Sequence, residues 1–391
     1  MKVRYNSELF RMEGFVDDQW NAVTIGSDIT MLSLPKKIDR YRIEVSLACN
    51  LSCEYCVVHK NDVSQQNKMM DLETAKVIVN KFNEEVGERG SLFLMGGEPL
   101  TNVDVVKFLI SASKGSSIIF TNSLALTDEL IEFFYTNNVY ILTSLDGHDL
   151  SHNEKRFHPN VELNFNQVVN NIKKAIDRRC KVGVSCLVHK DNIDDVGQIA
   201  TYFVEELGAK SMSFAYPHMT IKHTEESDFD FDKYSEQMIK LFEFAKNRKI
   251  YIDQIGKIIA PIYYSSPAII GCKAGTTQRT FYPNGKETVC TKIDTLNLFD
   301  IRQYCDDLPF NNHNCEKCLA QYICCGECPW DYAVAQLNGL QHGRICECRK
   351  KVITYIIDDI CRELSIANTI DEAKHMFKRI YGPLVNNYEE E

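Results

Sequence analysis

The sequence predicts an α/β fold, a partial (β/α)6 TIM-like barrel, followed by a cysteine-rich region. Two observations predict this arrangement. Six short apolar runs alternate with amphipathic segments between residues 41 and 225, and such alternation is typical of parallel strands joined by right-handed helical crossovers. Ten of the 16 cysteines then lie between Cys272 and Cys348, where weak hydrophobic periodicity indicates a region held together by metal rather than by an apolar core.

The barrel strands are expected at residues 43–47, 92–95, 117–120, 140–144, 181–187 and 211–215. Helical periodicity fills the intervals between them, at about residues 72–86, 102–113, 127–136, 165–179 and 194–207. Six such units are enough for an open barrel. Residues 1–40 are expected to be irregular, with a short hairpin formed by the alternating stretches 22–25 and 30–34.

After the barrel, a helix at about 231–248 leads into the cysteine-rich region, and two amphipathic helices at about 349–365 and 370–380 follow it. The chain therefore divides into five predicted parts: an N-terminal extension (1–40), the partial barrel (41–225), a connecting helical segment (226–270), the cysteine-rich domain (271–348) and C-terminal helices (349–391).

Composition narrows the class of protein. The chain has 391 residues, 44% of them hydrophobic, and a formal net charge of −10, which is typical of a globular protein and makes nucleic acid an unexpected partner. It has no run of about 18 apolar residues and no apolar signal segment, so we expect a cytoplasmic protein without membrane contact. The cytosol keeps thiols reduced, and crowded cysteines there are usually metal ligands. Cys180, Cys186 and Cys361 stand apart and are expected to be buried as small apolar side chains.

The first cysteine cluster is Cys49, Cys53 and Cys56, directly after the first barrel strand. Loops at the carboxyl ends of barrel strands are where such folds place their chemistry. Three thiolates bind three irons of a four-iron cluster and leave the fourth open to a substrate. A structural zinc site is the alternative, but zinc normally has four protein ligands, and His59 is the one nearby candidate for the fourth.

This segment resembles the signature of the radical S-adenosylmethionine (SAM) superfamily, including the aromatic Tyr55 before the third cysteine. Met95-Gly96-Gly97-Glu98-Pro99 resembles the family's GGEP motif, in which glycines allow close backbone approach and Glu98 would accept from the SAM ammonium. The resemblance implies further SAM contacts after the third and fourth strands, from Asn122, Ser144 and Asp146, and a bidentate contact between Arg156 and the SAM carboxylate.

The second group of cysteines resembles the SPASM extension of the same superfamily, which binds two auxiliary [4Fe-4S] clusters. The resemblance implies that Cys272, Cys290 and Cys328 hold an inner cluster. It implies an outer cluster held by Cys315, Cys318, Cys324 and either Cys346 or Cys348, with Cys325 a bystander. The fourth position of the inner cluster is an open iron, Cys305 or a ligand other than cysteine. A zinc ribbon is the alternative, but it would leave several cysteines without a role.

The resemblance implies an enzyme with SAM and three [4Fe-4S] clusters as cofactors and a flavodoxin or ferredoxin as electron donor. A 5′-deoxyadenosyl radical would abstract hydrogen from a peptide or protein, and the auxiliary clusters would accept the remaining electron. We expect a ribosomally made peptide as substrate and an intramolecular thioether, carbon–carbon or ether crosslink as product.

Two alternatives remain at this stage. The first is oxidation of a protein Cys or Ser to formylglycine, but Thr291 stands where that branch of the family has an Asp base. The second is a non-catalytic iron–sulfur or zinc protein for electron transfer. Asp294, Asp331, Tyr282 and His218 are weak candidates for a catalytic base. Only some 40 residues precede the barrel, so a precursor's leader segment is expected to bind the barrel or the N-terminal hairpin, or to be presented by a separate protein.

Overall fold

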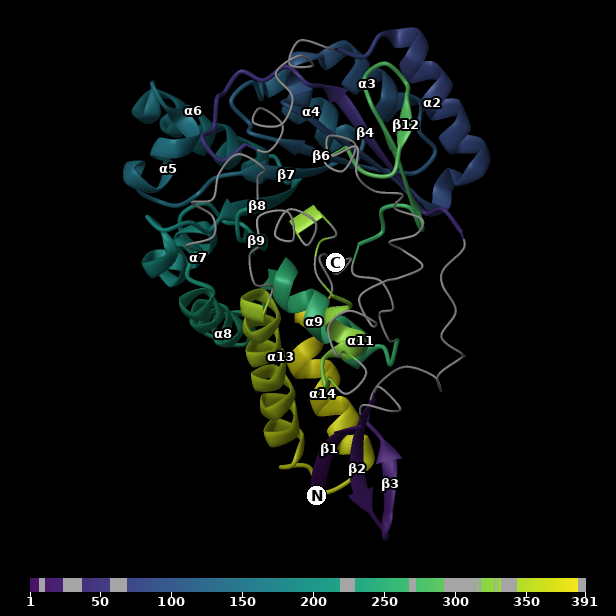
Figure 1. The fold of residues 1–391 in the computed structure, drawn as a ribbon, viewed down its shortest axis with the longest axis vertical. Helices are drawn as coiled ribbons and strands as arrows, with labels where there is room; N and C mark the ends of the chain where they lie inside the picture. Colours follow the sequence, from purple (N-terminus) through teal and green to yellow (C-terminus); the bar gives the residue numbers. More distant parts are fainter. Residues whose placement is uncertain are drawn as a thin grey trace.

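The computed structural model describes residues 1–6, 11–23, 37–56, 69–218, 229–266, 272–291, 315, 318–326, 328, 330–331 and 343–385. Its centre is a nine-stranded sheet in the order β10-β9-β8-β7-β6-β5-β4-β11-β12 (Figure 1). Six neighbouring strands are parallel and follow chain order: β4 (Arg40–Ser46), β5 (Ser91–Gly96), β6 (Ser116–Thr121), β7 (Tyr140–Ser144), β8 (Lys181–Leu187) and β9 (Ser211–Ala215). The predicted partial barrel is confirmed.

Helices connect these strands and cover the outer face of the sheet (Figure 1). They are α2 (Leu72–Glu85), α3 (Val103–Ala112), α4 (Asp128–Thr136), α6 (Val161–Asp177) and α7 (Val196–Glu205), with short 3-10 turns at η2 (Gly87–Arg89), η3 (Pro99–Thr101) and η4 (Ile193–Asp195). Strand residues such as Leu92 and Leu94 and helix residues such as Phe82 and Leu109 belong to one buried apolar cluster. Burial of this surface is the main force that holds the layers together.

One helix of the barrel was not expected. α5 (Leu150–Phe157) is mostly polar and lacks an apolar stripe, so periodicity gives little sign of it. Asp149 caps its start, because the carboxylate accepts a hydrogen bond from the backbone N–H of Ser151 at 2.8 Å. This helix carries Arg156 to the carboxyl edge of the sheet.

Both edges of the barrel sheet are extended by later parts of the chain. β10 (Tyr251–Ile252) pairs in parallel with β9. At the other edge β11 (Gln278–Phe281) pairs in parallel with β4, and β12 (Glu287–Thr288) pairs antiparallel with β11. The residues between Cys272 and Cys290 therefore continue the barrel sheet.

The second half of the chain adds a helical layer. α8 (Phe231–Arg248) packs against α13 (Gly343–Leu364), and α9 (Asp253–Tyr263) packs against α14 (Ile370–Val385); the short α11 (Gln321–Cys324) lies nearby (Figure 1). The fully buried Asp359 of α13 joins α8 and α14, because it binds Lys246 Nζ at 2.7 Å and Tyr381 OH at 2.8 Å. The expected C-terminal helices are present, but α13 begins six residues earlier than expected and so includes Cys346 and Cys348.

The expectation of an irregular N-terminus is wrong for three segments between residues 2 and 22. β1 (Lys2–Asn6), β2 (Arg11–Val16) and β3 (Gln19–Ala22) form an antiparallel sheet. The β2–β3 turn uses Asp17 and Asp18, both at positive φ (50° and 59°), which suits a hairpin turn but lacks the glycine that usually reveals one. The predicted hairpin at 22–25 and 30–34 falls almost entirely outside the described residues.

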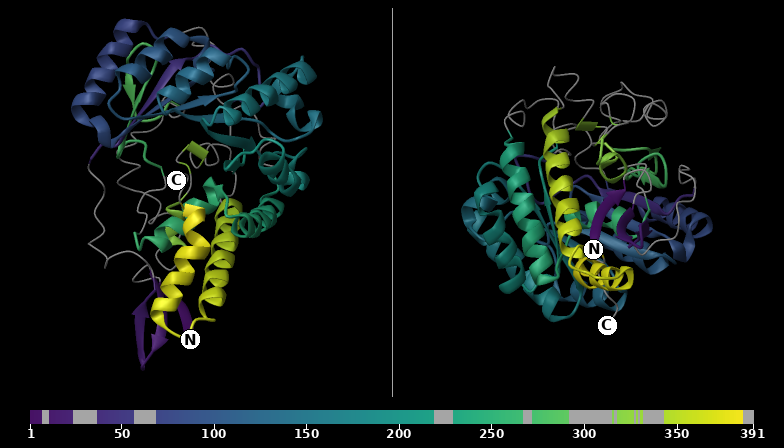
Figure 2. Two further views of the ribbon diagram at one scale, coloured as in Figure 1. Left: turned by 180° about the vertical axis from the view of Figure 1, so that it is seen from behind. Right: turned by 90° about the horizontal axis from the view of Figure 1, so that it is seen from below.

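This N-terminal sheet lies at the end of the molecule opposite α2–α4, beside α13 and α14 (Figures 1 and 2). The amino group of Met1 donates to the carbonyl oxygens of Ser365 and Ala367, both at 3.1 Å. The sheet is therefore part of the C-terminal packing. Among the helices that the structure describes, none is long and apolar enough to cross a membrane.

Candidate active site

The three cysteines of the first cluster lie in the loop after β4, at the carboxyl edge of the barrel sheet. All three are partly buried. The loop is held by its own backbone, since the N–H of Cys56 donates to the carbonyl of Cys53 at 3.1 Å. The Cys53 thiol also lies 3.6 Å from the carbonyl oxygen of Arg156 on α5.

Gly96 and Gly97 bring the end of β5 against this cysteine loop. A Cβ atom on Gly96, whose φ is +144°, would lie 2.0 Å from the carbonyl oxygen of Ser46, and one on Gly97 would lie 2.5 Å from that of Ala48. The N–H of Gly97 donates to Ser46 at 2.7 Å. These glycines thus allow the end of β5 to pack closely against the backbone that leads into Cys49.

Glu98 links the end of β5 to the end of β6. Its carboxylate is 1% exposed and accepts from Leu100 N at 3.0 Å, Thr121 Oγ1 at 2.7 Å and Asn122 N at 2.7 Å. Burial raises the pKa of Glu98 to about 7, against the opposite effect of these three donors. The carboxylate fixes two loops of the site, and its contact with the SAM ammonium stays a prediction.

Asn122 lies beside the first cysteine. Its amide nitrogen is 2.7 Å from Asn50 Oδ1 and 3.9 Å from Cys49 Sγ, and its amide oxygen accepts from Leu124 N. The predicted Asn122 and the cysteine loop are therefore brought together, through an Asn50 that the sequence analysis did not single out.

Asp146 and Arg156 form a buried ion pair. Arg156 Nε donates to Asp146 Oδ2 and Nη2 donates to Oδ1, both at 3.0 Å, and Tyr55 OH also donates to this carboxylate. The guanidinium lies 5.5 Å from the Tyr55 ring centre. Three of the predicted SAM-contacting residues thus bind one another, and the contact of Arg156 with a SAM carboxylate stays a prediction. Ser144 is the last residue of β7 and is partly exposed.

The thiols of this site suit an iron–sulfur cluster by their chemistry. Burial raises the pKa of Cys49 to about 12 and that of Cys53 to about 11. Thiolates become stable in such surroundings when a metal supplies positive charge, and binding then releases their protons. Three sulfur donors on one loop, with no other described His or carboxylate hydrogen-bonded to them, fit a cluster with one iron not bound by the protein.

In the cysteine-rich region Cys346 and Cys348 differ in their surroundings, since Cys346 is exposed and Cys348 is buried. Burial, together with the charges of the Cys346, Cys318 and Cys324 thiols, raises the pKa of the Cys315 thiol to about 11. The thiols whose charges act on Cys315 thus include Cys346 and not Cys348. Cys348 is instead buried among groups that include Asp232 of α8.

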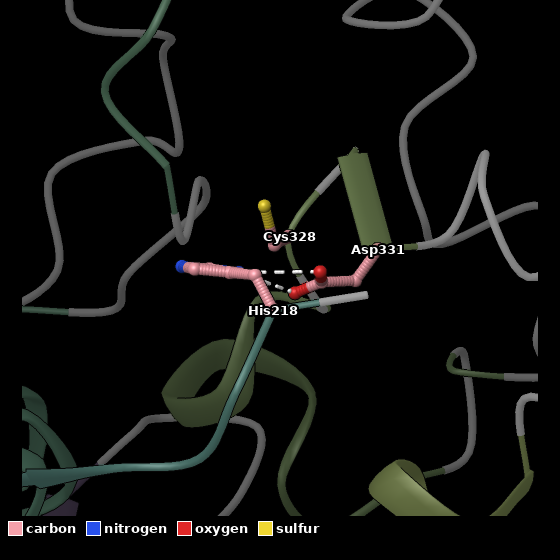
Figure 3. A group of neighbouring side chains, drawn as sticks. All are labelled: His218, Cys328 and Asp331. Carbon is pink, nitrogen blue, oxygen red and sulfur yellow. Dashed lines mark hydrogen bonds and ion pairs between the residues drawn. The ribbon is translucent and has the colours of Figure 1, made fainter. Parts of the chain in front are cut away.

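A second polar group lies just beyond β9. A ring nitrogen of His218, the sulfur of Cys328 and a carboxylate oxygen of Asp331 all lie within 4.8 Å of one another (Figure 3). Asp331 is 1% exposed, while the His218 side chain is 40% exposed. Two of the weak catalytic candidates therefore meet beside a predicted inner-cluster ligand.

The remaining candidates lie near the end of β12 or outside the described residues. Tyr282 OH donates to the carbonyl of Thr291 at 3.1 Å. Thr291 Oγ1 is 3.2 Å from Glu44 Oε1, and Glu44 is a 2% exposed carboxylate on β4 that also pairs with Arg42. Cys272 and Cys290 flank β11 and β12 in the chain and are partly buried. Asp294 and Cys305 fall outside the described residues.

Sequence reasoning missed several polar residues around these sites. Glu44 was one, although Arg42 and Glu44 alternate with apolar residues along β4, and this spacing puts both on one face of the sheet. Arg349 was another: its guanidinium lies 3.7 Å from Cys324 Sγ and donates to Tyr216 OH at 3.1 Å. An arginine on a C-terminal helix gives no sign in the sequence that it reaches a cysteine 25 residues earlier.

Residues 43–203 match the family model described as the radical SAM superfamily. The chain thus contains a radical SAM domain, in the part that carries the first cysteine cluster. It is 26% identical over 170 residues to a cysteine-type anaerobic sulfatase-maturating enzyme of Clostridium novyi (strain NT), covering 40% of this chain and 46% of the relative. It is 27% identical over 168 residues to a GTP 3′,8-cyclase of Clostridium perfringens (strain SM101 / Type A), covering 41% and 50%. The chain thus spans about half the length of these curated relatives.

Solved structures share the fold over more of the chain. Native anSMEcpe with bound AdoMet and Cp18Cys peptide matches with a TM-score of 0.68 at 18% identity, covering 83% of this chain and 99% of that one. Streptococcus suis SuiB bound to precursor peptide SuiA matches with a TM-score of 0.57 at 16% identity, covering 77% and 74%. This chain therefore shares its fold with these two proteins, each of which was solved with a bound peptide.

Proposed function

We propose that this protein is a radical SAM enzyme that oxidatively modifies a ribosomally made peptide, by installing an intramolecular crosslink. The observation that carries the proposal is the meeting of Cys49, Cys53 and Cys56 with Asn122 and the Asp146–Arg156 pair at one edge of the barrel. Support for a peptide substrate comes from structural neighbours that were solved with a bound peptide.

In this proposal the three cysteines hold a [4Fe-4S] cluster that binds SAM. When bound, the cluster would supply the electron that cleaves SAM, and the chain's own residues would hold the cluster in place. The residues around it position the cysteine loop: Gly96 and Gly97 allow its close packing on β5, and Tyr55 ties it to Asp146. Buried polar contacts of this kind hold a site rigid and limit the entry of water.

The second cysteine group is proposed to hold two auxiliary clusters. Cys315, Cys318, Cys324 and Cys346 would hold the outer one, because the charges of the other three thiols act on Cys315. Cys272, Cys290 and Cys328 would hold the inner one. Arg349 would stabilise the outer thiolates through its charge. A flavodoxin or ferredoxin in the cytoplasm is the proposed electron donor.

Thr291 bears on whether the product is a crosslink or formylglycine. It stands where formylglycine-forming relatives have an Asp, which favours crosslinking. Formylglycine formation is nevertheless a second candidate, because the buried carboxylate of Glu44 lies 3.2 Å from Thr291 Oγ1. A base supplied from β4 would replace the missing Asp.

Anaerobic incubation with SAM, a reductant and candidate peptides, followed by mass spectrometry, tests the proposal. We expect SAM-dependent loss of two hydrogen atoms from a Cys-rich or aromatic-rich precursor peptide, unaffected by Glu44→Gln. Conversion of a Cys or Ser to formylglycine, abolished by Glu44→Gln, would instead favour the second candidate. SAM cleavage without change in any peptide would contradict both.

A further inference from the structure

In the group formed by His218, Cys328 and Asp331, the imidazole of His218 is hydrogen-bonded to the carboxylate of Asp331, as is common for metal-binding histidines. His218 Nδ1 lies 2.9 Å from Asp331 Oδ2 and 3.2 Å from Oδ1. Metal-binding histidines almost always give their second ring nitrogen to a carboxylate or carbonyl, which fixes the tautomer and the ring orientation. Here the hydrogen bond to Asp331 uses Nδ1, so Nε2 is the ring nitrogen that would bind a metal.

Figure 3 shows this arrangement. The second ring nitrogen of His218 lies at the end of the ring away from Asp331, and the sulfur of Cys328 lies beside the ring. Asp331 is almost completely buried, so its position is set by packing, while the His218 side chain is 40% exposed. Both oxygens of Asp331 face the imidazole, which suits an orienting role better than a ligand role.

We propose that His218 is the fourth protein ligand of the inner auxiliary cluster, giving it three cysteines and one histidine. The inference rests on the proposed function, in which Cys272, Cys290 and Cys328 supply only three ligands. His218 follows β9 by three residues and therefore enters from the carboxyl edge of the barrel, whereas Cys328 comes from the cysteine-rich region. One cluster would thus bind both parts of the chain.

This ligand set has a chemical consequence. A neutral imidazole in place of a thiolate removes one negative charge from the cluster and its ligands, and such replacement raises the reduction potential of iron–sulfur centres. The inner cluster would then accept an electron more readily. Asp331 is a positioning residue, because it acts on the cluster through His218.

The test uses the full chain with Cys49, Cys53 and Cys56 changed to Ala, which removes the signal of the SAM-binding cluster. This chain and its derivatives His218→Ala, His218→Cys and Asp331→Asn are reconstituted anaerobically and reduced. Iron, sulfide and zinc are counted, and pulsed EPR on protein labelled with ¹⁵N-histidine reports nitrogen bound to iron. His375→Ala, an exposed histidine on α14, is the matched control.

We expect a histidine nitrogen coupling that disappears in His218→Ala and His218→Cys and persists in His375→Ala. His218→Cys should retain its iron and have a lower midpoint potential, and Asp331→Asn should keep the coupling with a shifted potential. Two full auxiliary clusters without histidine coupling, or a coupling that survives His218→Ala, would overturn the inference. So would one zinc per chain that is lost with His218, because it would indicate a mononuclear site.

These outcomes are separable from failure of the proposed function. SAM cleavage by the wild-type chain, together with an absent histidine coupling, would refute the ligand alone. If the chain binds no iron–sulfur cluster and does not cleave SAM, the proposed function and the His218 ligand are both refuted.

Discussion

Arg156 and Asp146 form a two-pronged ion pair in which both side chains are buried, with N–O distances of 3.0 Å for each prong. The same carboxylate accepts from Leu187 N at the end of β8 and from Tyr55 in the cysteine loop. One side chain therefore joins the loops after β4, β7 and β8. Bidentate arginine–carboxylate contacts are among the stronger polar contacts in proteins.

Removing this carboxylate should destabilise the fold and the cysteine loop together. Asp146→Ala leaves the Arg156 guanidinium buried without its counter-charge, and breaking a buried pair in this way costs about 3–5 kcal/mol. Anaerobic thermal unfolding followed by circular dichroism measures the effect. Glu132→Ala, which removes the carboxylate of an exposed bidentate pair with Arg178, is the matched control and should leave the midpoint almost unchanged. Equal shifts for the two variants would contradict the prediction.

The two glycines at the end of β5, Gly96 and Gly97, should be required for cluster binding. Gly96→Ala places a methyl group where the carbonyl oxygen of Ser46 lies, so the backbone leading to Cys49 must move. We expect loss of about four irons per chain and of SAM cleavage, measured by iron analysis and chromatography. Gly197→Ala on α7 is the control, because its added Cβ would meet no atom within 4 Å. Full iron content in Gly96→Ala would show that the close packing is not needed.

Glu98 should make stability depend on pH. Burial raises its folded pKa from 4.5 to about 7, so between these values the folded state binds more protons than the unfolded state. Stability from this group is present below pH 4.5 and is lost as pH rises through about 7, by roughly 3 kcal/mol in total. The thermal midpoint of wild type should fall across this window relative to Glu98→Gln. A wild-type midpoint that rises there relative to Glu98→Gln would mean that the three donors outweigh burial.

Cys346 and Cys348 should differ in their effect on iron content. Cys346→Ala should cost about four irons, since Cys346 interacts with Cys315. Cys348→Ala should keep the iron and lower the thermal midpoint slightly, because it removes a buried side chain beside α8. The reverse pattern of iron loss would assign Cys348 to the outer cluster.

Strands and helices of the barrel could be predicted because their apolar patterns are regular, and the structure places β7, β8 and β9 at the expected residues. The cysteine motif and the glycines at the end of β5 also predicted a functional site at the carboxyl edge of the sheet. Two elements were hidden: α5, which is mostly polar, and the N-terminal sheet, whose tight turn uses Asp17 and Asp18 in place of glycine. Both are stabilised by tertiary contacts that a local pattern does not contain.

Side-chain partners were harder to predict than elements. The sequence did not reveal that Arg156 and Asp146 bind each other, and their contacts with SAM stay predictions. The contact between His218 and Asp331 joins residues 113 positions apart, and Thr291 meets Glu44 across 247 positions. Such pairs depend on how the cysteine-rich region lies against the barrel, which spacing within either region does not reveal.

The most direct test of the central claim is an iron and sulfide count on the anaerobically reconstituted chain, paired with measurement of SAM cleavage. We expect about twelve irons in wild type and about eight when Cys49, Cys53 and Cys56 are changed to Ala, with 5′-deoxyadenosine formed only by wild type. About four irons, or zinc in their place, would contradict the auxiliary clusters. An undiminished iron count and continued SAM cleavage in the triple variant would contradict the assignment of the first cysteine cluster.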